Sequence, residues 1–307
     1  LRLTGFGCVV ARCASNRNTC GKSGSLDQVT SHPNYKLSCG HRSRPTTAIG
    51  RHAQPKGLTG YRSVLCDDRR VTPRPDYDTA IRAMWTGRDL QTQRQVESGR
   101  IDAGTRGSVT GGQHMTPLQD VIANQFAPLV VLGAEVRQDG IIPVPGFYRR
   151  TKNWDIVVTY KDVLVAAIEC KSQVGSFGNN FNNRTEEAIG NAVDIWRAYE
   201  AGLLGNVRPW LGFVFVIEYA EKSTTAIRDR GEPLYPADGV FDNTSYADRY
   251  EILFQRLVRE RLYDAACLIP TERGNGIHHE PVQEVSTHNL TAAIAGRVAY
   301  IANLDRH

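Results

Sequence analysis

The stretch "WDIVVTYKDVLVAAIECKSQ", residues 154–173, constrains the fold of this chain more than any other. Two runs rich in β-branched and other apolar residues, 154–160 and 163–171, flank the polar pair Lys161-Asp162. Short β-prone runs joined by a tight polar link are typical of a β-hairpin, so we expect two antiparallel strands here. Such apolar runs are buried in a sheet.

Three charged residues interrupt these apolar runs: Asp155, Glu169 and Lys171. A charge buried without a partner is costly, so these groups either neutralise one another or hold something. Glu169 and Lys171 are two residues apart and therefore point to the same face of their strand. A hairpin turning at Lys161-Asp162 brings Asp155 back toward that same end. We therefore expect two carboxylates and an ammonium to converge.

From residue 133, after two predicted helices, the sequence indicates strands first and then strands alternating with helices. This order favours a mixed α/β sheet with helices on both faces. The apolar and amphipathic periodicities predict helices at 76–99, 116–132, 182–202, 244–263 and 287–304, and further strands at 133–140, 140–150, 210–219 and 264–270. Thr116 is expected to cap one helix, with Pro117 at its first position, and Asn183 with Glu186 to cap another.

Residues 1–75 differ from the remainder in charge. They hold 13 Lys and Arg against 3 Asp and Glu, a net +10, whereas residues 76–307 hold 24 against 29, a net −5. Val, Ile, Leu and Phe make up only 13 of these 75 residues, which is too few to bury a core. We therefore expect residues 1–75 to be disordered and 76–307 to form the folded domain.

The same segment holds five of the seven cysteines: Cys8, Cys13, Cys20, Cys39 and Cys66. Their spacing matches no common zinc motif, so unpaired thiols in a basic tail are the favoured interpretation. A basic tail could also add non-specific affinity for nucleic acid. A further hypothesis is that the segment is an upstream or shifted reading frame, since the chain begins with Leu and its first Met is Met84.

The convergent charges have a chemical interpretation and a structural one. Asp155 and Glu169 could supply hard oxygen ligands for Mg²⁺, joined by the backbone carbonyl of Cys170, while Lys171 orients or deprotonates a water that attacks a phosphodiester. Alternatively, the acids are surface groups and the Glu169–Lys171 pair is a salt bridge. Physical reasoning alone leaves the two interpretations about equal.

The segment that follows adds a resemblance. "ECKSQVGSFGNNFNNRTEEAIGNAVDIWRAY" is similar to the XhoI family of type II restriction endonucleases, as are "QVESGRIDAGTRGSVTGGQHM", "TKNWDIVV" and "SYADRYEILFQRLVRERLYDAACLI". The resemblance covers about residues 76–303 and does not extend into 1–75. It implies a PD-(D/E)xK nuclease core, a homodimer, and Mg²⁺-dependent cleavage of double-stranded DNA within a six-base palindrome, CTCGAG. Asp155 and Glu169 then match the two metal-binding acids and Lys171 the motif's lysine; Asp120 or Glu97 could add a further acid.

Residues 173–184 also have a reading as a DNA-contacting loop. Side-chain amides can pair with adenine and an Arg fork with guanine. The candidates are Gln173, Asn179, Asn180, Asn182, Asn183 and Arg184. The alternative is that Asn and Gly simply form turns here, with Phe181 as a packing anchor. His114, His278 and His279 resemble metal ligands, but structural or solvated roles are favoured because no ligand spacing accompanies them.

Three functions stay open on these grounds: a restriction endonuclease, a structure-directed repair or recombination nuclease, and a non-catalytic DNA-binding relic. No apolar run reaches the roughly 20 residues needed to span a bilayer, and the start of the chain lacks the pattern of a secretory signal. The cytoplasm is therefore the expected location, with double-stranded DNA as the partner.

Overall fold

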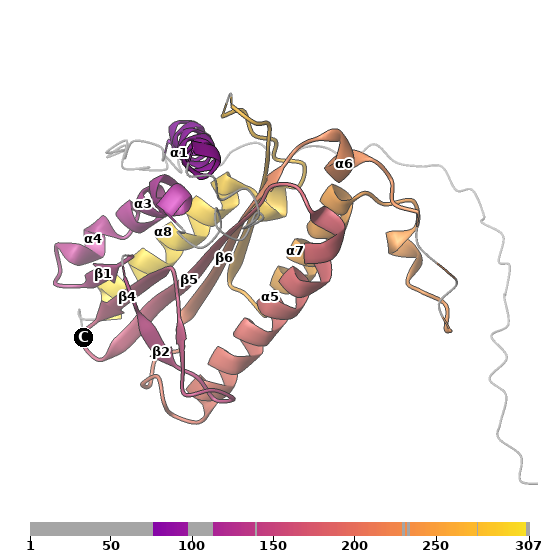
Figure 1. Cartoon of the computed structure of the whole chain (residues 1–307). Coiled ribbons are helices and arrows are strands. Elements are labelled where there is room, and N and C mark those ends of the chain that lie inside the picture. Colours follow the sequence, from indigo (N-terminus) through magenta and orange to yellow (C-terminus); the bar gives the residue numbers. More distant parts are fainter. Residues whose placement is uncertain are drawn as a thin grey trace, which may run out of the picture. The chain divides into compact units, whose positions relative to one another are not determined.

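A computed structural model of the chain describes residues 76–97, 113–138, 140–228, 231, 234–274 and 276–304 (Figure 1). The predictions made for residues 1–75, namely disorder, unpaired thiols and a shifted reading frame, lie outside the described residues. No helix within the described ranges is long and apolar enough to cross a membrane.

A five-stranded mixed sheet forms the centre of the fold, with strand order β1-β4-β5-β6-β7. Its first three strands are antiparallel neighbours, and β5, β6 and β7 run parallel to one another. The strands are β1 (Glu135–Arg137), β4 (Ile156–Tyr160), β5 (Val163–Gln173), β6 (Trp210–Glu218) and β7 (Ala265–Thr271). The predicted fold class, a mixed sheet flanked by helices, is confirmed.

The predicted hairpin is present as β4 and β5, joined by the turn at Lys161 and Asp162. Ile156 pairs with Ile168 and Tyr160 with Val163, with a register shift between Val158 and Thr159. The first strand starts later than predicted, at Ile156 rather than residue 154. Asp155 therefore sits in the bend before the strand, where its carboxylate escapes full burial.

Helices cover both faces of the sheet, and two apolar cores result. Figure 1 shows α1, α3 and α8 over one face and α5 and α7 over the other. The main helices are α1 (Tyr77–Glu97), α3 (Thr116–Asn124), α4 (Ala127–Val130), α5 (Phe177–Glu200), α7 (Tyr246–Arg259) and α8 (Thr287–Leu304). Shorter elements are η2 (Gln113–Met115), α6 (Glu221–Thr224), η3 (Gly239–Phe241) and η4 (Gln283–Val285).

Strand alternation decides which residues of β5 meet which core. Ile168 and Cys170 pack with α1 and α8, whereas Ala167 packs with α5 and α7. Glu169 and Lys171 are two and four residues after Ala167 in the same strand and therefore point to the α5/α7 face. This is the face on which the remaining parts of the candidate site lie.

A second, two-stranded sheet also covers that face: β2 (Pro143–Pro145) paired with β3 (Thr151–Asn153). The strand predicted over 140–150 is present as β2, but it pairs with β3 and is not part of the main sheet. The turn of this small hairpin is fixed to α5 by Asp194, which accepts hydrogen bonds from the amides of Phe147 (2.9 Å) and Tyr148 (2.8 Å) and from Nε of Arg149 (2.6 Å). A Cβ at Gly146 would lie 2.7 Å from Asp194 Oδ2, so glycine is required there.

The start of α5 corrects a second prediction. The helix begins at Phe177, so most of the expected loop from Gln173 to Arg184 is helical, and Asn183 lies within the helix and does not cap it. Phe177 stacks on Tyr246, and Phe181 packs edge-on against Tyr250 with 5.0 Å between the ring centres. This packing stabilises helical turns whose Gly and Asn content disfavours a helix.

The other predicted cap is displaced by one residue. Met115, rather than Thr116, occupies the N-cap position of α3, so Pro117 stands at the second helical position and not the first. In α7, Ser245 accepts a hydrogen bond from the amide of Asp248, whose carboxylate accepts from the amide of Ser245 in return. This reciprocal pair explains why the helix begins at Tyr246.

Candidate active site

The predicted convergence of Asp155, Glu169 and Lys171 is present in the structure. Lys171 forms an ion pair with Oε1 of Glu169, and its Nζ lies 3.8 Å from Oδ2 of Asp155. The same Asp155 oxygen accepts a hydrogen bond of 2.7 Å from the backbone amide of Cys170. The register explains the meeting: Ile156 pairs with Ile168, so Asp155, one residue earlier, stands opposite Glu169.

A second lysine, which the sequence did not predict, completes this cluster. Lys152 of β3 places its Nζ 2.5 Å from Oε2 of Glu169, and only 10% of its side chain is exposed. The ammonium also lies 4.3 Å from the ring centre of Trp154 and donates to the carbonyl of Asn153. The buried carboxylate of Glu169 is thus held by one lysine at each oxygen.

The charges of the cluster shift the protonation of two of its members. Burial raises the pKa of Asp155, the nearby Glu169 carboxylate adds to this rise, and Lys171 and the Cys170 amide oppose it. Burial by itself would lower the pKa of Lys171, but the carboxylates of Glu169 and Asp155 outweigh that effect and raise its pKa above the usual value. Lys171 is therefore a stable ammonium in this arrangement.

The donor set fits a hard divalent cation. Asp155 and Glu169 supply carboxylate oxygens, which Mg²⁺ and Ca²⁺ prefer. Cys170 could contribute only its carbonyl, because its side chain is buried in the core on the opposite face and burial raises the pKa of the thiol. Among the described residues no three His, Cys, Asp or Glu side chains gather into a metal-binding group, so a cation at Glu169 would depend on two side chains and the backbone.

The predicted DNA-contacting residues divide into three groups. Gln173 is buried, and its amide oxygen accepts a hydrogen bond from the hydroxyl of Tyr250, so it does not offer a base-reading surface as expected. Asn179, Asn182 and Asn183 are exposed on the first turns of α5. At spacings of three and four residues they share one helical face.

The other two candidates in this segment already have partners within the helix. Asn180 donates to the carbonyl of Ser176 at 3.0 Å, and Arg184 forms an ion pair of 2.5 Å with Glu187. Glu187 also contributes to the raised pKa of Lys171, after burial and the closer acids. Glu187 of α5 is therefore near enough to Lys171 to influence its charge.

The two further acids considered from the sequence have partners outside the cluster. Asp120 accepts a hydrogen bond of 2.6 Å from Gln138, and Glu97 accepts one of 2.9 Å from Gln93. Neither contact brings a third acid to Asp155 and Glu169.

His114 has the structural role that the sequence favoured. It is buried, and its Nε2 lies 2.8 Å from the hydroxyl oxygen of Ser172. Burial, with a smaller contribution from Arg88, lowers the pKa of His114 to about 4. The ring is therefore neutral at physiological pH.

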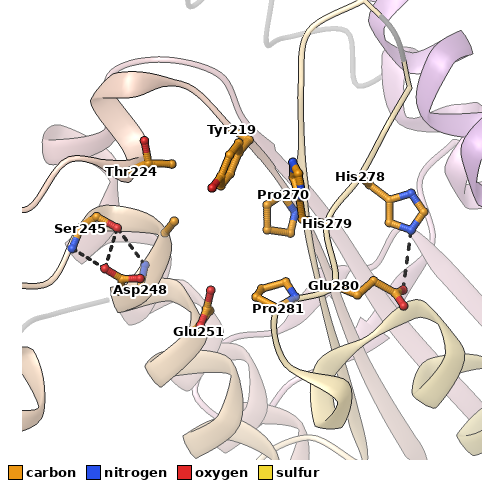
Figure 2. Close-up of a pocket in the computed structure, with 11 residues that line it drawn as sticks. Tyr219, Thr224, Ser245, Asp248, Glu251, Pro270, His278, His279, Glu280 and Pro281 are labelled. Atoms are coloured by element: carbon orange, nitrogen blue, oxygen red, sulfur yellow. Dashed lines mark hydrogen bonds and ion pairs between the residues drawn. The ribbon is translucent and has the colours of Figure 1, made fainter.

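His278 and His279 line a pocket of about 550 Å³ beside the ends of β6 and β7 (Figure 2). His278 lies within ion-pair distance of Asp78 and Glu280, at 2.9 and 3.7 Å. The ring of His279 packs on Tyr219, with 4.4 Å between ring centres. These contacts give both histidines structural partners.

The fold and this cluster together define the chain as an α/β protein with an Asp–Glu–Lys cluster at the end of a buried hairpin, as expected for a PD-(D/E)xK nuclease core. The sequence model of the family described as restriction endonuclease XhoI matches residues 94–280. The chain belongs to this family, which confirms the predicted resemblance.

Three relatives carry names of the same kind. The chain is 37% identical to the type II restriction enzyme BstVI of Geobacillus stearothermophilus, over 66% of this chain and 95% of the relative. It is 40% identical to the type II restriction enzyme XhoI of Xanthomonas vasicola, over 60% and 76%. It is 42% identical to the type II restriction enzyme AbrI of Azospirillum brasilense, over 47% and 66%. No solved structure matches the chain.

Proposed function

We propose that this chain is a type II restriction endonuclease that hydrolyses phosphodiester bonds of double-stranded DNA within a six-base palindrome, CTCGAG, with Mg²⁺. The observation that carries the proposal is the cluster of Asp155, Glu169 and Lys171, which converges within a chain of the XhoI family. The names of the three relatives support the class of activity.

Each residue of the cluster has a distinct role in this proposal. Asp155, Glu169 and the carbonyl of Cys170 would hold the divalent cation. When bound, the cation would polarise the phosphate and lower the pKa of the attacking water. Lys171 supplies positive charge and hydrogen-bond donors where charge grows on the phosphorane. The raised pKa of Lys171, caused by Glu169 and Asp155 against the opposing effect of burial, favours this ammonium role over that of a general base.

Sequence recognition is assigned to the first turns of α5. Asn179, Asn182 and Asn183 form an exposed amide stripe on α5, and amides pair with the N6/N7 edge of adenine. Arg184 could pair with guanine by exchanging Glu187, which is itself exposed, for a base. The side chains of Asn180 and Gln173 are hydrogen-bonded within the fold, so they would not contact bases directly. They would instead help to position neighbouring residues.

The two halves of a palindromic site are equivalent, so the enzyme is proposed to bind it as a homodimer with one subunit on each half. The proposed location is the cytoplasm. Residues 76–307 would form the catalytic domain of each subunit. The acidic balance of that domain, a net −5, implies a local basic patch at the DNA surface, because phosphate contacts dominate DNA affinity.

A repair or recombination nuclease built on the same core would also use the Asp–Glu–Lys cluster. It would cut branched or damaged DNA without a palindrome. A DNA-binding relic would keep the fold and lose the reaction. The presence of both acids and the lysine at the positions of the family motif favours a catalytic chain over a relic.

A plasmid digest tests the proposal. The purified chain should cut duplex DNA in Mg²⁺ and leave it intact in Ca²⁺ or chelator, because Ca²⁺ binds oxygen ligands with looser geometry. Sequenced fragment ends should all fall within one palindromic hexamer. Cutting in chelator would refute the metal mechanism, and cutting at junctions alone would support the repair nuclease.

A further inference from the structure

Lys152 has no role in the function proposed above, although it contacts the most buried acid of the cluster. Its Nζ lies 2.5 Å from Oε2 of Glu169, and 10% of the Lys152 side chain and 4% of the Glu169 side chain are exposed. Lys171 occupies the other oxygen. Glu169 therefore has no carboxylate oxygen free for a cation.

We propose that Lys152 is a phosphate-binding residue of this site, which holds Glu169 while no divalent cation is bound and moves to a DNA phosphate when a cation replaces it. The inference rests on the proposed function, since it assigns a further substrate contact to the same site.

The contacts of the two lysines indicate which of them needs a new anionic partner once a cation occupies Glu169. Lys171 also lies 3.8 Å from Asp155, so it keeps a carboxylate partner in the site if it loses Glu169. Lys152 has only a backbone carbonyl, at 2.9 Å from Asn153, and the face of Trp154 besides Glu169. If a cation displaces Lys152 from Glu169, Lys152 therefore loses the one carboxylate contact that the structure describes for it.

Because the β2–β3 hairpin is anchored to α5, the side chain of Lys152 can move while the backbone stays in place. Asp194 and Asn191 of α5 hold Arg149, and Asp194 holds the amides of Phe147 and Tyr148. The turn before β3 is thus held by its backbone as close as four residues before Lys152. The aromatic face of Trp154 can keep the ammonium close to the site during the exchange, as cation–π contacts do.

A count of charges supports the exchange. Two lysines balance the two carboxylates of the cluster as it stands. A divalent cation leaves an excess of two positive charges, which a singly charged phosphodiester balances only in part. When the attacking water gives its proton to the solvent, the phosphorane carries about two negative charges and completes the balance, so the charge of Lys152 stabilises the transition state more than the bound substrate.

The first test measures Ca²⁺ binding to the DNA-free protein by calorimetry, so it does not depend on cleavage. Lys152→Met removes the competing cation and should bind Ca²⁺ about tenfold more tightly, the scale on which neighbours of metal ligands act. Lys152→Arg keeps the ion pair and should resemble the wild type. Lys161→Met, in the turn at the far end of the hairpin, is the matched control. Unchanged or weaker binding by Lys152→Met would overturn the inference.

The second test measures affinity for a CTCGAG duplex in Ca²⁺ and in chelator. Lys152→Met should lower the affinity in Ca²⁺, with a salt dependence reduced by about one phosphate contact, and should leave the affinity in chelator unchanged. An equal loss in both conditions, or no loss in either, would contradict a phosphate contact made by exchange. If the Met variant does not fold, Lys152→Gln removes the same charge and keeps a donor to Glu169.

The two proposals can fail separately. If the wild type does not cut DNA in Mg²⁺, the proposed function is wrong, whatever the variants bind. If the wild type cuts and Lys152→Met binds Ca²⁺ no more tightly, only the role of Lys152 is wrong.

Discussion

The backbone amide of Cys170 donates a hydrogen bond of 2.7 Å to Oδ2 of Asp155. This bond joins the acid in the bend before β4 to the strand that carries Glu169 and Lys171. The two carboxylates are consequently held near each other without a bound cation. Such preorganisation spares the site a rearrangement at the moment of reaction.

Asp155→Asn should abolish cleavage and raise the melting temperature of the metal-free protein at neutral pH. Burial and then Glu169 raise the pKa of Asp155, so the folded state disfavours its ionised form. The stability associated with Asp155 is therefore present below its unfolded pKa and lost as pH rises through the folded pKa. Asn retains an acceptor for the Cys170 amide and carries no charge. Thermal melting at pH 7, beside a cleavage assay, measures both effects.

Two outcomes would contradict this reasoning. A lower melting temperature for Asp155→Asn would mean that its ion pair with Lys171 outweighs the cost of burying its charge. Cleavage at the wild-type rate would remove Asp155 from the site.

His114→Gln should flatten the dependence of stability on pH between about 4 and 6.5. Burial, then Arg88, lowers the folded pKa of His114 from 6.5 to about 4. The unfolded chain then binds more protons in this window, so stability is complete above pH 6.5 and lost as pH falls toward 4. At about 1.4 kcal/mol per pKa unit, the loss is on the order of 3 kcal/mol. Chemical unfolding at several pH values measures it; equal slopes in both proteins would show that His114 does not titrate there.

Asn183→Ala should leave stability unchanged or raise it by up to about 0.7 kcal/mol, because Asn183 lies within α5 and alanine is the better helix former. If Asn183 reads a base, the same variant should weaken specific DNA binding and relax the sequence requirement. Melting and binding to matched and mismatched duplexes separate these effects. A stability loss of about 1 kcal/mol would instead indicate a capping role.

Asp194→Ala should destabilise the protein by about 2–3 kcal/mol, because the amides of Phe147 and Tyr148 lose their acceptor. The β2–β3 hairpin that carries Lys152 should loosen with it. Hydrogen exchange localises the effect: faster exchange confined to residues 143–153 is expected, whereas unchanged exchange there would show that Asp194 does not hold the hairpin.

Local patterns predicted the hairpin that builds the site, because its signals lie within 20 consecutive residues, 154–173. The start of α5 was missed, since Gly178 and four asparagines disfavour a helix and the packing of Phe177 and Phe181 on Tyr246 and Tyr250 overrides them. Tertiary contacts of this kind leave no local signal.

Lys152 was missed for a similar reason. It lies on a three-residue strand of a separate sheet, and no spacing rule relates it to Glu169. A count of charges gives a hint: Asp155, Glu169 and Lys171 leave one negative charge in excess, which calls for another cation.

The most direct test of the Asp–Glu–Lys site is the single-turnover cleavage rate of Lys171→Ala on a CTCGAG duplex in Mg²⁺, measured beside its melting temperature. Glu169 keeps Lys152 as a partner in this variant, so the fold should survive, and Lys161→Ala is the matched control. We predict a rate loss of at least about 10²-fold, as for other groups that stabilise transition-state charge, with duplex binding retained. A Lys171→Ala protein that melts far lower yet cuts at the wild-type rate would contradict the assignment.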